Sequence, residues 1–276
     1  MKILTATFTD FIKFNKKPNE DYFLVSSKYP IFVIGDGVTQ SLFEDGKYAY
    51  PAGARVASQI FCHSVLEYIE KNFEPKKEII EKAFDFANER IWQLNLVEGM
   101  VEKLDYDIYD LFDTVGVTAF LINSQLFYGF VGDCGLAIFD KNNFLKFETK
   151  DLVLPAKERA KRKYPNWEKI PKRERTKIMH KEFRNCPSGL GYGSFTGEKG
   201  VKKYYRIDKK ILKEKDLVVL FSDGFREYLK FPEFVEILRK GDKKSLEEFS
   251  FKKAKENPKI FGTDRTLISF VYEKNT

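Results

Sequence analysis

The chain has 276 residues, enough to bury a large core as one domain or as a core domain that carries an insertion. Its 43% hydrophobic and 16% aromatic residues exclude an intrinsically disordered chain, and no apolar run reaches the roughly 18 residues of a membrane-spanning helix. The two His and three widely separated Cys argue against a zinc site of His and Cys and show no disulfide framework, so we expect any metal to be held by oxygen. The first residues lack the apolar stretch of a signal peptide, and we expect a cytoplasmic protein.

The net charge of +7 is concentrated in one segment. Residues 156–184 contain twelve Lys or Arg and four Glu, a local charge of +8, so the rest of the chain sums to about −1. Such a segment is typical of a surface for phosphate-bearing partners or nucleic acid, and equally of a solvated amphipathic helix or insertion. We favour the solvated segment, because no pattern of stacking aromatic residues accompanies the charges.

The first third of the chain predicts strands followed by helices. Strand-like runs with turn signals between them predict an antiparallel meander at residues 3–8, 22–26 and 31–34. Apolar residues then recur at helical spacing, which predicts two long helices at residues 56–69 and 76–104.

The remainder returns to strands. Residues 115–122 and 126–131 predict a hairpin. The Gly-rich loop at residues 185–193 lacks the Gly-Lys-Ser/Thr ending of a P-loop, so we expect a hinge in preference to a phosphate cradle. Further strands are expected at residues 136–139, 202–207, 217–221 and 266–272, with helices at 232–240 and 245–256. Because paired helices separate groups of strands, the pattern favours an α+β fold in which two packed sheets carry helices outside.

Three aspartates follow buried-looking strands. Asp36, Asp133 and Asp223 each end an apolar run and have glycine close by. Strand ends hold carboxylates rigidly at the rim of a sheet, and clustered carboxylates repel one another unless cations intervene. Oxygen ligands select Mg²⁺ or Mn²⁺, so the sequence predicts a metal-dependent phosphoester hydrolase, with Asp264 and the pair Glu20-Asp21 as further candidates.

Six short segments carry a family resemblance through their order along the chain. They are Asn19-Glu20-Asp21, Ile34-Gly35-Asp36-Gly37, Gly116-Val117-Thr118-Ala119, Gly132-Asp133-Cys134, Phe221-Ser222-Asp223-Gly224 and Asp264-Arg265-Thr266. Together they resemble the motifs of the metal-dependent Ser/Thr protein phosphatases of the 2C type.

The resemblance implies a fold and an activity. The fold is a four-layer α/β/β/α sandwich, two antiparallel sheets flanked by helix pairs, in a single catalytic domain over residues 1–276 with a basic flap-like insertion at about 152–200. The activity is hydrolysis of phosphoserine or phosphothreonine in proteins by a metal-activated water, with two or three Mg²⁺ or Mn²⁺ ions. The expected partner is a phosphorylated protein, and we expect a monomer without membrane attachment.

The resemblance also implies metal roles for particular residues. Asp36 would bridge two ions. The Gly37 carbonyl and Glu20 would complete the second ion, while Asp223 and Asp264 would hold the first.

A third, weaker metal position is matched by Asp133 together with Asp223. The sequence departs from the family where many members have a phosphate-binding arginine, here Lys16, and where some have a histidine after the central Asp-Gly, here Val38. The expected catalytic residues are Asp36 and Asp223, with Lys16 as the phosphate contact.

Two other functions stay open. The first is an inactive phosphatase-like protein that regulates or binds. The second, which we do not favour, is a nucleic-acid-binding protein that uses residues 156–184.

Overall fold

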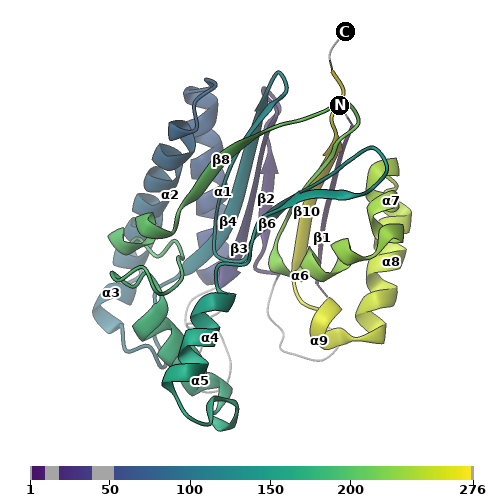
Figure 1. Ribbon diagram of the computed structural model, residues 1–276. Coiled ribbons are helices and arrows are strands. Elements are labelled where there is room, and N and C mark those ends of the chain that lie inside the picture. The colour runs from purple at the N-terminus through teal and green to yellow at the C-terminus, as the bar shows by residue number, and fades with distance from the viewer. Residues whose placement is uncertain (1, 10–18, 39–52, 275–276) are drawn as a thin grey trace.

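The structure consists of two antiparallel sheets packed face to face between two layers of helices (Figure 1). It is a computed structural model that describes residues 2–9, 19–38 and 53–274. Hydrophobic clusters fill the space between the sheets and the space between each sheet and its helices. The predicted four-layer α/β/β/α sandwich is therefore confirmed.

Within the described residues, each sheet has five strands. The first sheet has the order β1 (Ile3–Phe8), β10 (Arg265–Val271), β9 (Leu217–Phe221), β6 (Gly135–Phe139) and β7 (Leu145–Glu148). The second sheet has the order β2 (Tyr22–Val25), β3 (Ile31–Val38), β4 (Asp113–Ile122), β5 (Gln125–Val131) and β8 (Arg206–Ile211).

The helices divide between the two outer faces and the insertion. The second sheet is covered by α1 (Gly53–Lys71) and α2 (Glu78–Val97), followed by α3 (Met100–Lys103). The first sheet is covered by α7 (Pro232–Lys240) and α8 (Lys243–Glu256), with α6 (Asp223–Arg226), the 3₁₀ turn η4 (Glu227–Lys230) and α9 (Pro258–Phe261) nearby. Every helix in the described ranges is too short or too polar to cross a lipid bilayer.

Side-chain alternation along β3 sets the direction of its aspartate. Ile31 and Val33 pack with α1 and α2, whereas Phe32 and Ile34 pack between the sheets. Successive side chains of a strand point to opposite faces. Asp36 therefore continues the series of Phe32 and Ile34 and points toward the first sheet.

The first sheet shows the same alternation. Val218 and Leu220 of β9 and Ile268 of β10 lie in the cluster between the sheets. Ser222 and Thr266 extend these two series by one step, and both are fully buried. Polar side chains thus replace apolar ones where the core between the sheets ends.

The predicted meander is wrong for the first strand. Only β2 and β3 pair with each other, while β1 lies in the other sheet and pairs with β10, with Ile3 opposite Phe270. That pairing joins the two ends of the chain, so local turn signals could not indicate it.

Two local predictions also need correction. The long helix predicted at 76–104 is interrupted at Gly99, whose φ of 66° lies in the left-handed region and separates α2 from α3. The strand predicted at 202–207 begins instead as the 3₁₀ segment η3 (Lys199–Tyr204), because Val201 and Tyr204, three residues apart, are both buried. The strand β8 follows it.

The basic insertion folds as a compact flap. It contains α4 (Leu154–Lys163), the 3₁₀ turn η1 (Trp167–Lys169), α5 (Lys172–Ile178) and the π-helical turn η2 (Met179–Phe183). Its own small core includes Ala156, Ala160 and Trp167. In Figure 1, α4 and α5 lie beyond one end of the sandwich.

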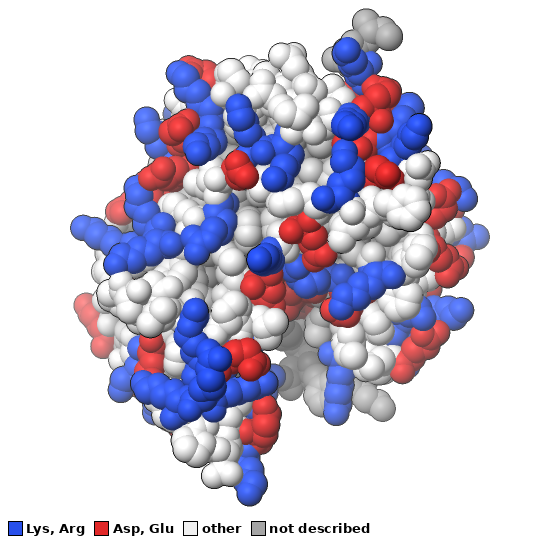
Figure 2. Space-filling model, in the orientation of Figure 1, with Lys and Arg blue, Asp and Glu red and all other residues white. Residues whose placement is uncertain are grey.

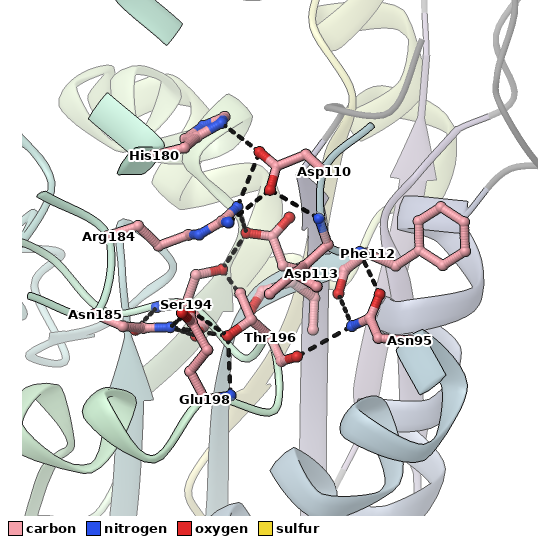
Figure 3. A network of polar contacts seen from close by, with 12 residues as sticks. Asn95, Asp110, Phe112, Asp113, His180, Arg184, Asn185, Ser194, Thr196 and Glu198 are labelled. Atoms are coloured by element: carbon pink, nitrogen blue, oxygen red, sulfur yellow. Dashed lines mark hydrogen bonds and ion pairs between the residues drawn. The ribbon is translucent and has the colours of Figure 1, made fainter. Parts of the chain in front are cut away.

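A buried ion network attaches the flap to the core (Figure 3). The Arg184 guanidinium donates to both carboxylate oxygens of Asp110, at 3.2 and 2.6 Å, and lies 3.5 Å from Asp113 Oδ2. Nδ1 of His180, in η2, lies 2.9 Å from Asp110 Oδ2, the oxygen that is 3.2 Å from Arg184. Asp113 is the first residue of β4 and Asp110 lies in the segment just before it, so one arginine ties the end of the flap to the second sheet.

The same network also holds the chain that leaves the flap. Ser194 Oγ donates to Asp113 at 2.8 Å, and the Asn185 side-chain amide donates to the Ser194 carbonyl at 2.9 Å. Asn95 of α2 donates to the carbonyls of Phe112 and Thr196. The C-terminal part of the flap is thereby fixed to the start of β4 and to the helix layer.

Replacing Arg184 with methionine is expected to lower the free energy of unfolding by about 3–5 kcal/mol, because two buried carboxylates would lose their counter-charge. Urea unfolding of the Arg184→Met variant measures the loss. The matched control is Arg173→Met, which removes an ion pair of 2.7 Å with Asp107 between two exposed side chains and should cost less than about 1 kcal/mol. Equal losses in the two variants would contradict an anchoring role for Arg184.

Candidate metal centre

Antiparallel pairing brings the predicted aspartates to one end of the sandwich. In the second sheet, Asp36 pairs with Val115 close to the end of β3. In the first sheet, the end of β9 pairs with the start of β6 and lies beside the start of β10. Asp133, Asp223 and Asp264 adjoin these three strand ends and therefore share that edge.

Hydrogen bonds join the motif at residues 19–21 to the first sheet. The Asp264 carboxylate accepts from the Thr9 hydroxyl and, at 3.2 Å, from the Glu20 backbone N–H. The Asp21 Oδ2 atom accepts from the Ser222 hydroxyl at 2.7 Å. Within the described chain, the buried Oδ1 atom of Asp21 has no hydrogen-bond partner. The site therefore contains a carboxylate oxygen that a cation could satisfy.

Asp36 is at the electrostatic centre of this group. Burial by the surrounding protein raises the pKa of Asp36 well above its usual range. The negative charges of four other aspartates raise this pKa further, those of Asp21, Asp223, Asp133 and Asp264. Asp36, which the resemblance implies is the bridging ligand, is thus the carboxylate on which the charges of the other four aspartates all act.

The neighbouring carboxyls are shifted in the same direction. Burial, with a contribution from the charge of Asp223, raises the pKa of Asp133 to about 7. Burial also raises the pKa of Asp21 to about 6 and that of Asp223 to about 6, although part of the Asp223 side chain meets solvent. Lys157 of α4 acts in the opposite direction, because its positive charge lowers the pKa of both Asp133 and Asp223.

This donor set fits hard divalent cations. Ionised carboxylates so close together are unfavourable, and bound cations would favour the ionised forms again. Asp36, Asp133 and Asp264 are partly exposed and Asp223 is exposed, so ions can reach them from solvent. An all-oxygen set suits Mg²⁺ or Mn²⁺.

The side chains do not form a finished coordination shell. Over residues 2–9, 19–38 and 53–274, no three His, Cys, Asp or Glu side chains lie close enough together to hold an ion by themselves. Mg²⁺ usually keeps several waters and binds few protein ligands directly. Carboxylates spaced more widely than a complete shell are compatible with that mode of binding.

The two predicted ligands of the second ion, Glu20 and the Gly37 carbonyl, both lie in closely packed surroundings. The Glu20 side chain is buried, with 1% of its surface exposed. Gly37 packs against the start of α1 so closely that a Cβ atom there would lie 2.5 Å from the Ala54 carbonyl oxygen. Only glycine fits this backbone position, which lies directly beside Asp36. The predicted phosphate contact, Lys16, lies outside the described residues.

Sequence reasoning gave too little weight to two aspartates. Asp21 was only a candidate addition, yet it joins the two sheets through Ser222. Asp151 was not considered, although its charge raises the pKa of Asp133 and Asp223. Its position before the Pro155 helix start is typical of a capping aspartate, and it accepts from the backbone N–H groups of residues 153 and 154. That local role hides its closeness to the site.

The raised pKa values predict how stability depends on pH without metal. A carboxyl whose pKa is higher in the folded than in the unfolded state stabilises the fold at low pH and loses this effect as pH rises through the folded value. In chelator, the melting temperature should therefore fall between about pH 4 and about pH 7, as Asp21, Asp223 and Asp133 ionise, and Asp36 should continue the fall above that interval.

Mn²⁺ should reverse this trend, because it binds the ionised carboxylates. Calorimetry at matched ionic strength should show a larger rise in melting temperature with Mn²⁺ at the upper pH than at the lower. A melting temperature in chelator that rises across the same interval would contradict the assigned electrostatics.

Comparison with known proteins gives structural matches alone. No family model and no curated protein matches the sequence. PstP of Mycobacterium tuberculosis, a serine/threonine phosphatase, is 14% identical, with a TM-score of 0.64 over 99% of each chain. A PstP catalytic domain is also known in complex with two manganese ions.

Two other solved phosphatases match over a similar extent. The S. agalactiae serine/threonine phosphatase is 15% identical, with a TM-score of 0.62 over 99% of each chain. The PPM Ser-Thr phosphatase MsPP from Mycobacterium smegmatis, in complex with cacodylate, is 16% identical, with a TM-score of 0.58 over 99% of this chain and 98% of that one. At such identities the likeness establishes the fold, and this chain has the fold that these serine/threonine phosphatases share.

Proposed function

We propose that the chain is a Mg²⁺- or Mn²⁺-dependent phosphatase that hydrolyses phosphoserine and phosphothreonine in proteins. One observation carries the proposal. Asp36 from the second sheet and Asp133, Asp223 and Asp264 beside the strands of the first sheet act on one another electrostatically at the same end of the sandwich. The ionised carboxylates repel one another in this arrangement, and bound cations would stabilise it.

The proposed roles are those that the resemblance to the 2C-type phosphatases implies. When bound, divalent cations would neutralise charge on a phosphoryl group and activate a water for its hydrolysis. The charges of Asp21, Asp133, Asp223 and Asp264 all act on Asp36, which is proposed to bridge two ions. Asp223 and Asp264 would hold the first ion, and Glu20 with the Gly37 carbonyl the second.

A third ion would use Asp133 together with Asp223. The backbone supports these roles, because the Thr114 hydroxyl donates to the Asp36 carbonyl at 2.7 Å and Ser58 donates to the Glu20 carbonyl at 2.6 Å. These bonds fix the main chain on both sides of the site, which limits the movement of the carboxylates.

The substrate class is supported by the solved proteins that share the fold, which are serine/threonine phosphatases, one of them with two manganese ions. The phosphate contact of Lys16, the monomeric state and the cytoplasmic location stay predictions from the sequence. An inactive phosphatase-like protein is the alternative that an activity measurement excludes.

The Asp36→Asn variant should separate metal chemistry from folding. It should reduce Mn²⁺-dependent hydrolysis of an aryl phosphate and of a phosphothreonine peptide by about 100-fold or more. In chelator it should melt at a higher temperature than the wild type near pH 8, since one repelled carboxylate is removed. Kinetics and calorimetry on the same preparations measure both effects.

The matched control is Asp85→Asn, which removes an exposed carboxylate on α2 that pairs with Lys202 at 2.8 Å. It should retain wild-type turnover and the wild-type response to Mn²⁺. If the wild type binds Mn²⁺ but shows no chelator-sensitive hydrolysis, the chain is an inactive phosphatase-like protein. If Asp36→Asn keeps full turnover, the proposed ligand set is wrong.

A further inference from the structure

A pocket of about 490 Å³ lies between the flap and the carboxylate end of the sandwich. On the core side it is lined by Asp133, Val38 and Val115. The remaining lining residues come from the flap and the loop that follows it. The pocket therefore opens directly beside the candidate metal centre.

The flap side of the pocket is rich in cations. Lys157 and Lys161, one turn apart on α4, line it together with Lys172 and Arg175 of α5. Figure 2 shows Lys and Arg side chains gathered over the part of the surface that Figure 1 assigns to α4 and α5. Four of the twelve cations of the basic segment therefore line one pocket, together with two of its glutamates, Glu158 and Glu168.

Two of these four cations already have carboxylate partners. Lys161 lies 3.2 Å from Glu158 and 3.6 Å from Glu168, and Arg175 lies 3.0 Å from Glu168. Lys157 and Lys172 are exposed, and their side chains form no ion pair or hydrogen bond with any residue in the described ranges. They are the cations that a ligand in the pocket can engage without breaking an existing pair.

The pocket also has an apolar wall. Trp167, Met179 and Tyr192 line it, and each keeps less than a tenth of its surface exposed because all three belong to the small core of the flap. Cations beside an apolar wall suit an acidic peptide segment. The methylene groups of its Asp or Glu side chains can pack against the wall, while their carboxylates form ion pairs with the cations. Because the rings of Trp167 and Tyr192 are buried, they offer no exposed face on which nucleic-acid bases could stack.

We infer that the flap pocket binds acidic side chains of the phosphoprotein substrate that flank the phosphorylated residue, with Lys157 and Lys172 as their ion-pair partners. This rests on the proposed function, because the phosphorylated residue itself must occupy the neighbouring metal centre. Asp133 belongs to both the pocket and the centre, so a peptide chain can pass from one to the other without crossing the protein.

The test compares two phosphothreonine peptides, one with Glu on both sides of the phosphothreonine and one with Gln at the same positions. With Mn²⁺ and low salt, the wild type should have a KM for the Glu peptide about three- to tenfold below that for the Gln peptide. The Lys157→Gln/Lys172→Gln variant should show nearly equal KM values for the two. The preference of the wild type should also shrink as salt is added.

The matched control is Lys252→Gln/Lys255→Gln, which removes the same charge from exposed positions of α8 on the other outer face. It should keep the full preference for the Glu peptide. The ratio of KM values compares two substrates on one protein, so it is insensitive to the amount of folded enzyme.

Three results would overturn the inference. They are a wild type without preference between the peptides, a flap variant that keeps the preference, and a control variant that loses it equally. The pocket would be assigned to nucleic acid instead if the wild type and the control variant bound single-stranded DNA, the flap variant did not, and the flap variant kept its preference for the Glu peptide. If the wild type does not hydrolyse an aryl phosphate with Mn²⁺, the result counts against the proposed function and not against the flap pocket.

Discussion

The structure depends on bringing several carboxylates together at one end of a two-sheet sandwich. Antiparallel pairing brings such side chains together within each sheet, because the end of one strand lies beside the start of its neighbour, and the packing of the two sheets brings the two sets together. Asp36 points from the second sheet toward the first, where Asp223 and Asp264 follow and precede paired strands. Burial and mutual repulsion raise the pKa of Asp36, so the arrangement is stable in its ionised form only with positive charge nearby.

Positive charge reaches this end from one side, through the flap. Lys157 lowers the pKa of Asp133 and Asp223, and it lines the flap pocket together with Lys161, Lys172 and Arg175. Arg184 is different in kind, because it is buried and holds the flap on Asp110. The basic segment therefore has two physical functions, although its sequence is a single run of positive charge. Arg184 anchors the flap internally, and exposed cations such as Lys157 form a surface beside the acidic centre.

Much of this was readable from the sequence because it is local. The apolar run before Asp36, the glycine after it and the paired helices predicted β3, its carboxylate and the layer order. The pairing of β1 with β10 was not readable, since it joins distant segments that have no shared local signal. The burial of Arg184 and the inter-sheet bond of Asp21 were missed for the same reason, because both depend on partners far away in the sequence.

The origin of the carboxylates in different sheets has a mechanical consequence. The inner faces of the two sheets meet mainly through apolar contacts, with the Asp21–Ser222 bond at one end. An ion held by Asp36 and Asp223 at once would be a cross-link between layers, joining residues that are far apart along the chain. Like a disulfide across a long loop, it would restrict the unfolded chain as well as hold the folded one. Loading the site would then tighten the whole sandwich, and losing the ion would let the two layers separate first at the end where substrate enters.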